Sequence, residues 1–138
     1  MIGILIIAHG TLGESLIHCA SHVLNKRPPR VGQLGITAQD DPALLLPQAR
    51  NLVKELDTGD GVLILSDMYG GTPSNMAAKL VVPGKVEAVA GINLPMLIRV
   101  LTYRDRDLQT IVTKAISGGC EGVMRVPIFN LPNAAAGS

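Results

Sequence analysis

Apolar runs alternate along the chain with segments whose apolar residues recur at helical spacing. Residues 2–8 and 62–65 are almost unbroken apolar runs, typical of strands covered on both faces, and residues 31–36 and 85–90 are weaker candidates of the same kind. Between and after these runs, apolar residues three or four positions apart predict helices. This order predicts an α/β fold with three layers, in which helices cover both faces of a mostly parallel sheet.

Local chemistry indicates where some helices begin and end. Thr11 and Glu14 have the spacing of a capping box, which predicts a helix start. The second helix begins either at Pro42 or later, because Pro47 would remove a backbone hydrogen bond inside it. The glycine pair at positions 118–119 predicts the end of the last helix.

The last apolar run covers residues 122–129 and contains Pro127. Proline has no amide N–H to donate to a neighbouring strand, so a strand that contains it belongs at an edge of the sheet. We therefore predict an antiparallel C-terminal edge strand. With 138 residues the chain has room for one domain, which we assign to residues 1–130, followed by a short tail at 131–138.

Composition and charge exclude several classes of function. A net charge of +1 and an aromatic content of 2% leave neither a basic surface for phosphate backbones nor rings to stack on bases, so we expect no nucleic-acid partner. The first apolar run is far shorter than the roughly 18–20 residues of a membrane span, so we expect a cytoplasmic protein without membrane insertion. Cys19 and Cys120 lack the spacing of a metal site or a disulfide framework, and we expect buried free thiols.

The carboxyl ends of parallel strands are where α/β proteins bind their ligands, and three segments of this sequence fall there. They are His9-Gly10, residues 67–73 and residues 91–95. The imidazole of His9 is placed beside the start of a helix and is a nucleophile near neutral pH. The alternative is a histidine that only closes the strand with a hydrogen bond.

Asp67 is the second candidate residue, because its carboxylate can accept the proton of one ring nitrogen of His9 and leave the other free to attack. Its alternative role is a turn or helix cap. Gly70 and Gly71 leave their amides accessible, and Thr72 begins a helix, so the three residues can form an anion-binding pocket. Together these residues predict a site that carries a phosphoryl group on histidine, without a metal.

Three motifs resemble one protein family, the mannose-family IIA component of the bacterial phosphoenolpyruvate-dependent sugar phosphotransferase system. They are residues 6–10 (IIAHG), 66–75 (SDMYGGTPSN) and 91–97 (GINLPML). The resemblance implies that Nε2 of His9 accepts a phosphoryl group while Asp67 holds the other ring nitrogen. It also implies that Gly71 and Thr72 surround the phosphoryl oxygens, and it implies no cofactor.

The resemblance further implies partners. The phosphocarrier HPr would donate the phosphoryl group, and a IIB component would accept it. We expect a separate IIB protein, because no linker or IIB domain follows residue 129. Family members are homodimers that exchange a C-terminal edge strand, and they act with a membrane permease, which gives this chain an indirect link to the membrane.

Other functions stay open on the sequence. The chain could be a regulatory binding module in which phosphorylation of His9 controls partner proteins without sugar transport. A relative that donates phosphoryl groups to a dihydroxyacetone kinase shares the fold. A tetrapyrrole metal chelatase also has a His-Gly pair after its first strand, but it needs further metal-facing ligands beside Asp67.

Overall fold

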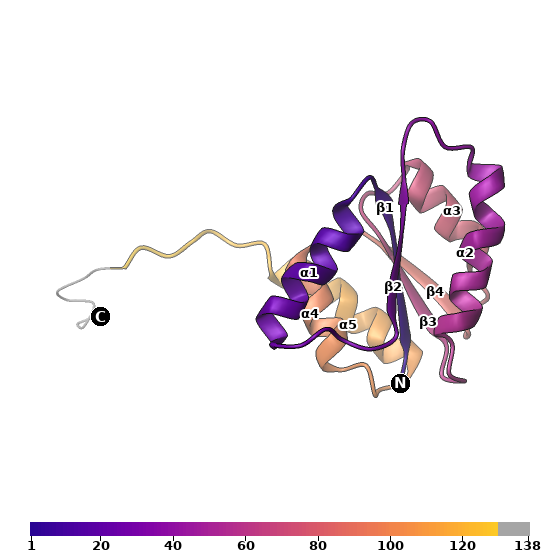
Figure 1. Cartoon of the computed structure of the whole chain (residues 1–138). Helices are drawn as coiled ribbons and strands as arrows, with labels where there is room; N and C mark the ends of the chain where they lie inside the picture. Colours follow the sequence, from indigo (N-terminus) through magenta and orange to yellow (C-terminus); the bar gives the residue numbers. More distant parts are fainter. Residues whose placement is uncertain (130–138) are drawn as a thin grey trace.

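The computed structural model describes residues 1–129, in which a parallel sheet lies between two layers of helices (Figure 1). Along the described chain the elements are β1 (Gly3–His9), α1 (Leu12–Leu24), β2 (Val31–Ile36), α2 (Pro42–Leu56), β3 (Val62–Ser66), α3 (Thr72–Leu80), β4 (Val86–Ala90), α4 (Leu94–Thr102) and α5 (Leu108–Glu121). The strands pair in the order β2-β1-β3-β4, and every pairing is parallel. The predicted α/β fold and its parallel sheet are confirmed.

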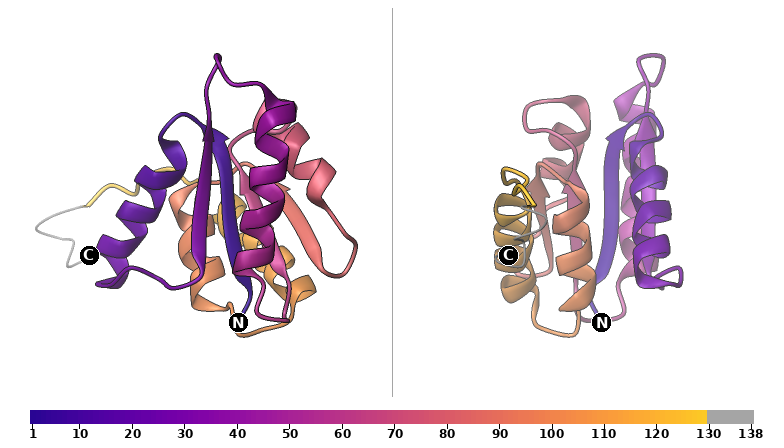
Figure 2. Two further views of the ribbon diagram at one scale, coloured as in Figure 1. Left: turned by 45° about the vertical axis from the view of Figure 1, so that its right-hand side comes forward. Right: turned by 90° about the vertical axis from the view of Figure 1, so that its left-hand side faces the viewer.

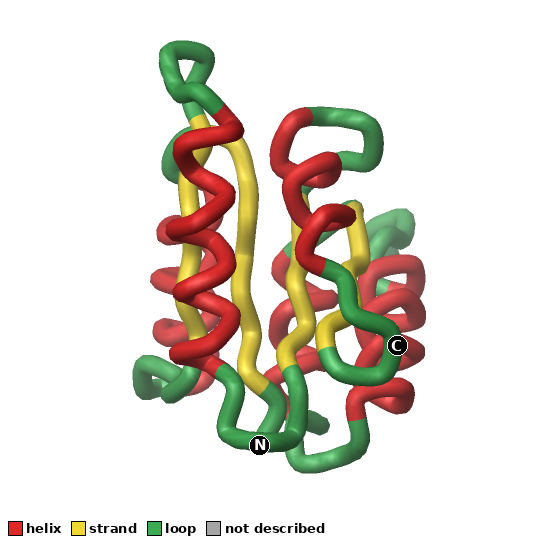
Figure 3. The backbone as a smooth tube through the Cα atoms, turned by 90° about the vertical axis from the view of Figure 1, so that its right-hand side faces the viewer, coloured by secondary structure: helices red, strands yellow, loops and turns green. Residues whose placement is uncertain are grey.

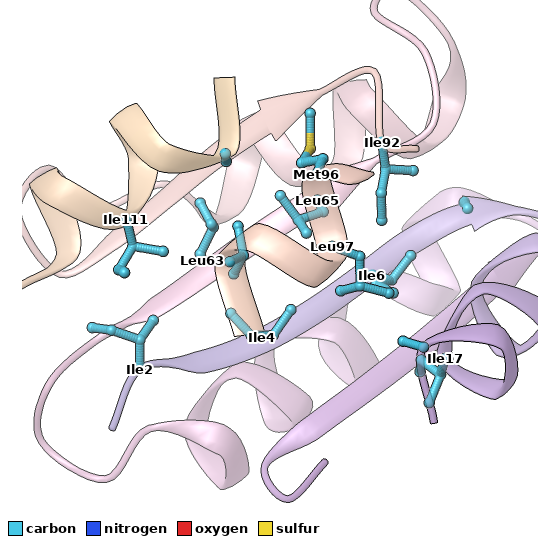
Figure 4. Packing of buried hydrophobic residues seen from close by; sticks show 14 of the residues in the cluster. Ile2, Ile4, Ile6, Ile17, Leu63, Leu65, Ile92, Met96, Leu97 and Ile111 are labelled. Carbon is cyan, nitrogen blue, oxygen red and sulfur yellow. The ribbon is translucent and has the colours of Figure 1, made fainter. Parts of the chain in front are cut away.

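The central strand β1 is buried on both faces, which explains its unbroken apolar sequence. Ile4 and Ile6 face the layer formed by α1, α4 and α5, where they pack with Leu63 and Leu65 of β3 (Figure 4). The alternating residues Leu5 and Ile7 face α2 and α3 on the other side of the sheet. Figures 2 and 3 show the two helical layers on opposite sides of the sheet. This double cover holds β1 rigidly up to its last residue.

Both α1 and α2 begin at a position that the sequence indicated, but only α2 has a side-chain cap. The carboxylate of Asp41 accepts a hydrogen bond from the amide of Ala43 at 3.0 Å, so α2 begins at Pro42 and continues through Pro47. At the start of α1, Thr11 makes no side-chain capping bond, so the predicted capping box is wrong. Its backbone, at φ −99° and ψ 9°, lacks the extended conformation of a typical N-cap residue.

The sequence predicted that the glycine pair at positions 118–119 ends the last helix. This prediction is wrong, because α5 continues to Glu121. A side chain at either glycine would collide with α4. A Cβ atom at Gly118 would lie 2.9 Å from Cβ of Arg99, and one at Gly119 would lie 2.8 Å from Cε of Met96. The glycines therefore allow close packing of two helices instead of marking a helix end.

The predicted antiparallel edge strand is absent from the described residues. Residues 123–129 form no strand and run away from the body of the domain (Figure 1). Pro127 and the lack of a neighbouring strand for this segment within residues 1–129 explain this. The side chains of Val126, Ile128 and Phe129 are more than three-quarters exposed. The tail assigned to 131–138, and residue 130 of the predicted domain, lie outside the described residues.

Two further observations concern the surface of the described part. Cys19 and Cys120 are exposed, so the expectation of buried thiols was wrong. Cys19 belongs to the outward face of α1 and Cys120 to the last turn of α5. Within residues 1–129, no helix combines the length and apolar character that crossing a membrane requires.

Arg104 is buried at the amino ends of the strands, with 5% of its surface exposed. Its guanidinium donates to the carbonyl oxygens of Ile2, Pro29 and Arg30. Burial lowers the pKa of Arg104, although an arginine side chain keeps its charge at any physiological pH. One side chain thus joins the α4–α5 loop to the residues that precede β1 and β2.

Candidate functional site

His9 is the last residue of β1, at the carboxyl end of the sheet. All residues of β1 before it are buried, whereas the side chain of His9 is 51% exposed. Ladder bonds to β2 and β3 fix the backbone of the strand, and the amide of Gly10 donates to the carbonyl of Ile36 at 2.9 Å. The imidazole therefore projects from a rigid support into solvent.

Asp67 directly follows β3, the strand next to β1, and it binds His9 twice. Its Oδ2 atom lies 2.7 Å from Nδ1 of the ring and accepts the backbone amide of His9 at 2.9 Å. Its Oδ1 atom accepts the amide of Met68 at 3.0 Å. Because an ionised carboxylate can only accept, Nδ1 must carry the ring proton, and Nε2 of the neutral ring keeps a free electron pair.

The environment of Asp67 favours its charged form. Burial alone would raise the pKa of this carboxyl, whose side chain is 12% exposed. Hydrogen bonds from the amide and ring of His9, together with the charge of the ring, outweigh burial and hold the pKa of Asp67 below its ordinary value. Asp67 is therefore ionised throughout the neutral pH range and can orient the imidazole.

The predicted pocket residues lie at the start of α3, and one of them contacts the imidazole side of the site. A Cβ atom at Gly71 would lie 3.2 Å from Cε1 and 3.6 Å from Nε2 of His9, so the glycine leaves the space beside Nε2 free. Thr72 is the first residue of α3, and Gly71, which has no side chain, is its N-cap residue. Gly70 has a positive φ of 93° and open space around its Cα atom. The start of α3 therefore faces His9 with little side-chain bulk.

Among residues 1–129, no group of three or more His, Cys, Asp or Glu side chains is arranged to hold a metal ion. His18 and His22 are both exposed on α1 and form no such group. The site described above consists of an imidazole, a carboxylate and the amino end of a helix.

Comparison with known protein families shows to which family the chain belongs. The model of the family described as the PTS system fructose IIA component matches residues 3–116. The chain belongs to this family. Membership confirms the resemblance found in the sequence and supports a role in phosphoryl transfer within the sugar phosphotransferase system.

Individual members of the IIA family agree with this assignment. The chain is 35% identical over 125 residues to the mannose-specific EIIAB component of Escherichia coli K12, a match that covers 88% of this chain and 38% of that protein. It is 39% identical over 54 residues to the fructose-specific EIIA component of Bacillus subtilis, covering 38% of this chain and 37% of that protein. The chain thus spans well under half the length of the Escherichia coli protein, and the match to the Bacillus subtilis protein covers only part of both chains.

Solved structures of IIA proteins share the fold. A mannose/sorbose-specific IIA subunit from Enterococcus faecalis has a TM-score of 0.83 at 21% identity, with 94% of this chain and 98% of that chain covered. An EIIA component from Streptococcus agalactiae has a TM-score of 0.80 at 24% identity, with 91% and 97% covered. The arrangement of strands and helices is therefore that of known IIA domains.

The sequence did not reveal every contact that builds the site in this IIA-family chain. The amide of His9 donates to Asp67, and the carbonyl of Ser66 accepts the amides of Gly91 and Ile92, both at 3.0 Å. Each of these bonds has a backbone amide as its donor, and the direction of a backbone amide is not encoded by side-chain identity. The sequence indicated only that residues 91–95 follow a predicted strand and therefore lie at the same end of the sheet as His9 and Asp67.

Asp67 makes the stability of the protein depend on pH with a definite sign. Its pKa is lowered in the folded state, so its contribution is fully present above the ordinary carboxyl value of about 4 and is lost as the pH falls through the lower folded value. In urea unfolding between pH 7 and pH 3, we expect the free energy of unfolding to fall less for Asp67→Asn than for the wild type below about pH 4. An equal fall in the free energy of unfolding of both proteins would show that ionised Asp67 does not stabilise the fold.

Proposed function

We propose that the protein is a phosphoryl carrier that accepts a phosphoryl group on Nε2 of His9 and passes it to an acceptor protein. The observation that carries the proposal is the 2.7 Å contact between Nδ1 of His9 and Oδ2 of Asp67. This contact assigns the proton to Nδ1 and leaves Nε2, beside the side-chain-free Gly71, as the nucleophile. Membership of the IIA family supports the same role.

The reaction follows from this arrangement. The electron pair of Nε2 forms a bond to phosphorus. At the same time the bond between phosphorus and a nitrogen atom of the donor protein breaks, and that nitrogen keeps the bonding electron pair. The ring of His9 becomes positively charged and retains its proton on Nδ1. Asp67 stabilises this charge through the hydrogen bond from Nδ1. Transfer to the acceptor reverses these steps and restores the neutral imidazole.

The pocket at the start of α3 holds the phosphoryl oxygens in this proposal. The amino end of a helix carries free amide groups and a partial positive charge, both of which favour an anion. Gly70, Gly71 and Thr72 form this end of α3, and Gly71 lies beside the ring. We assign these three residues to phosphoryl binding and Asp67 to orienting His9.

The partners are the finer part of the proposal. We propose HPr as the donor, a separate IIB component as the acceptor, and an indirect link to a membrane permease from a cytoplasmic location. We also propose a homodimer in which two copies exchange residues 122–129. The exposed apolar side chains of that segment, together with β4 at the edge of the described sheet, support the exchange.

The function is tested by incubating the protein with phosphoenolpyruvate, enzyme I and HPr and measuring its intact mass. We expect a gain of one phosphoryl group that is lost in acid, as phosphohistidine is, and that disappears when a IIB component is added. The reaction without HPr is the control. No gain with an active donor would refute the carrier function. A stable gain that no IIB component removes would favour the regulatory module instead.

Substitution of Gly71 tests the pocket. The backbone of Gly71, at φ −88° and ψ 174°, suits alanine, so we expect Gly71→Ala to fold normally. Its methyl group would lie 3.6 Å from Nε2 and occupy space that the phosphoryl group needs. We expect the initial rate of phosphoryl uptake to fall about 10- to 100-fold. Gly32→Ala, on β2 and in ordinary contact with Leu56, is the matched control and should retain the wild-type rate.

A further inference from the structure

The turn between β4 and α4 is joined to the residue that precedes Asp67. The carbonyl of Ser66 accepts two hydrogen bonds, from the amides of Gly91 and Ile92, each at 3.0 Å. Ser66 is 2% exposed, so these bonds are shielded from water. Gly91 adopts a φ of 94°, a conformation that other residues rarely take, and this lets two successive amides point at one carbonyl. The orientation of the peptide that leads into Asp67 therefore depends on this turn.

Asn93 fixes the turn from its other side. Its Oδ1 atom accepts the amide of Met96 at 2.9 Å and caps α4, while its Nδ2 atom donates to the carbonyl of Gly119 in α5 at 3.1 Å. A helix cap needs only the first of these bonds. The second one joins the start of α4 to the last turns of α5, 26 residues further along the chain.

We propose that Asn93 is a positioning residue for phosphoryl transfer on His9. This inference rests on the proposed function. By holding the turn at residues 91–92 against α5, Asn93 keeps the carbonyl of Ser66 in place, and through it the carboxylate of Asp67 that orients the imidazole. Each step is a hydrogen bond of 3.1 Å or less between described atoms, apart from the covalent steps from Ser66 to Asp67 and from Ile92 to Asn93.

Asn93 also lies at a groove beside β4, the edge strand of the described sheet. A molecule bound in this groove would contact the hydrogen bonds that connect Asn93 to the site of His9. Asn93 and Gly91 line a mostly apolar groove of about 300 Å³, together with Gly119, Cys120 and Val123. Val123 follows Gly122, the residue that caps the end of α5, and begins the exposed apolar segment. The bond from Asn93 to Gly119 therefore joins two residues that line this groove.

Two substitutions separate the positioning role from capping. Asn93→Asp keeps an oxygen that accepts the amide of Met96 but has no proton to donate to Gly119. Asn93→Ser also keeps a capping oxygen, adds no charge and removes the same donor. The matched control is Glu121→Gln, which weakens the contact between Arg99 and Glu121, another link between α4 and α5 that does not involve the turn.

The imidazole nitrogen shifts of His9 are measured by NMR in the unphosphorylated proteins, together with the rate of phosphoryl uptake from HPr. We expect both Asn93 variants to change the nitrogen shifts of His9 and to slow uptake about three- to tenfold, as for the loss of one hydrogen bond, with an unchanged circular dichroism spectrum. Glu121→Gln should behave like the wild type.

Wild-type shifts and rates in both Asn93 variants would overturn the inference and leave the carrier function intact. An equal change in Glu121→Gln would also overturn it, because any loosening of α5 would then suffice. If the wild type takes up no phosphoryl group, the proposed function fails, and the nitrogen shifts still decide whether Asn93 positions the imidazole. If Asn93→Asp fails to fold, Asn93→Ser decides the outcome.

Discussion

No phosphoryl group is expected on the chain when His9 is replaced by glutamine. The amide group of glutamine can still donate a hydrogen bond to the carboxylate of Asp67, but it has no nitrogen with a free electron pair to attack phosphorus. The side chain is half exposed, so we expect little change in the free energy of unfolding. Intact mass after incubation with phosphoenolpyruvate, enzyme I and HPr measures the loss.

The other two histidines of the chain provide the controls. His18 and His22 are exposed on α1, away from Asp67, and we expect His18→Gln and His22→Gln to take up the phosphoryl group at the wild-type rate. Uptake by His9→Gln, combined with its loss in either control, would move the site to α1 and refute the assignment of His9.

The largest loss of stability is expected from Arg104→Met. Methionine fills part of the space but cannot donate to the carbonyl oxygens of Ile2, Pro29 and Arg30, of which that of Ile2 is buried and the other two are partly buried. Buried acceptors that lose a charged donor typically cost about 2–4 kcal/mol in the free energy of unfolding. For a domain of this size, that corresponds to a fall of roughly 10 °C in Tm.

Urea unfolding at pH 7 measures this effect, with Arg106→Met as the control. Arg106 is exposed and lies 5.8 Å from the centre of the Tyr103 ring, a contact worth at most about 1 kcal/mol at the surface. We therefore expect a much smaller change from this substitution. Equal changes for the two arginines would show that the buried hydrogen bonds of Arg104 contribute little.

The sequence is sufficient to predict the pairing of His9 with Asp67. Both residues directly follow buried apolar runs, and parallel strands bring their carboxyl ends to the same edge of the sheet. The adjacency of β1 and β3 then leaves the two side chains within hydrogen-bonding distance. Local pattern and fold rules agree at this site, which is why it could be found without the structure.

Other features depend on contacts between distant parts of the chain. A charged residue beside Tyr103 and Asp105 is typical of a solvated loop, and only the positions of three remote carbonyls explain why Arg104 is buried. The glycines of α5 resemble a helix end until the surface of α4 is in place. The C-terminal run has the composition of a strand but no partner strand in its own described chain.

The buried hydrogen bonds of Arg104 and the proposed phosphoryl site lie at opposite ends of the sheet, and this has a consequence for how the protein can diverge. Arg104 acts where β1 and β2 begin, whereas His9, Asp67 and the exposed Met68 and Tyr69 lie where β1 and β3 end. Strand β1 separates the two regions by roughly 20 Å. Under the proposed function, substitutions around His9 that alter which partner is recognised would leave the hydrogen bonds of Arg104 unchanged, so partner specificity and this part of the stability can vary independently.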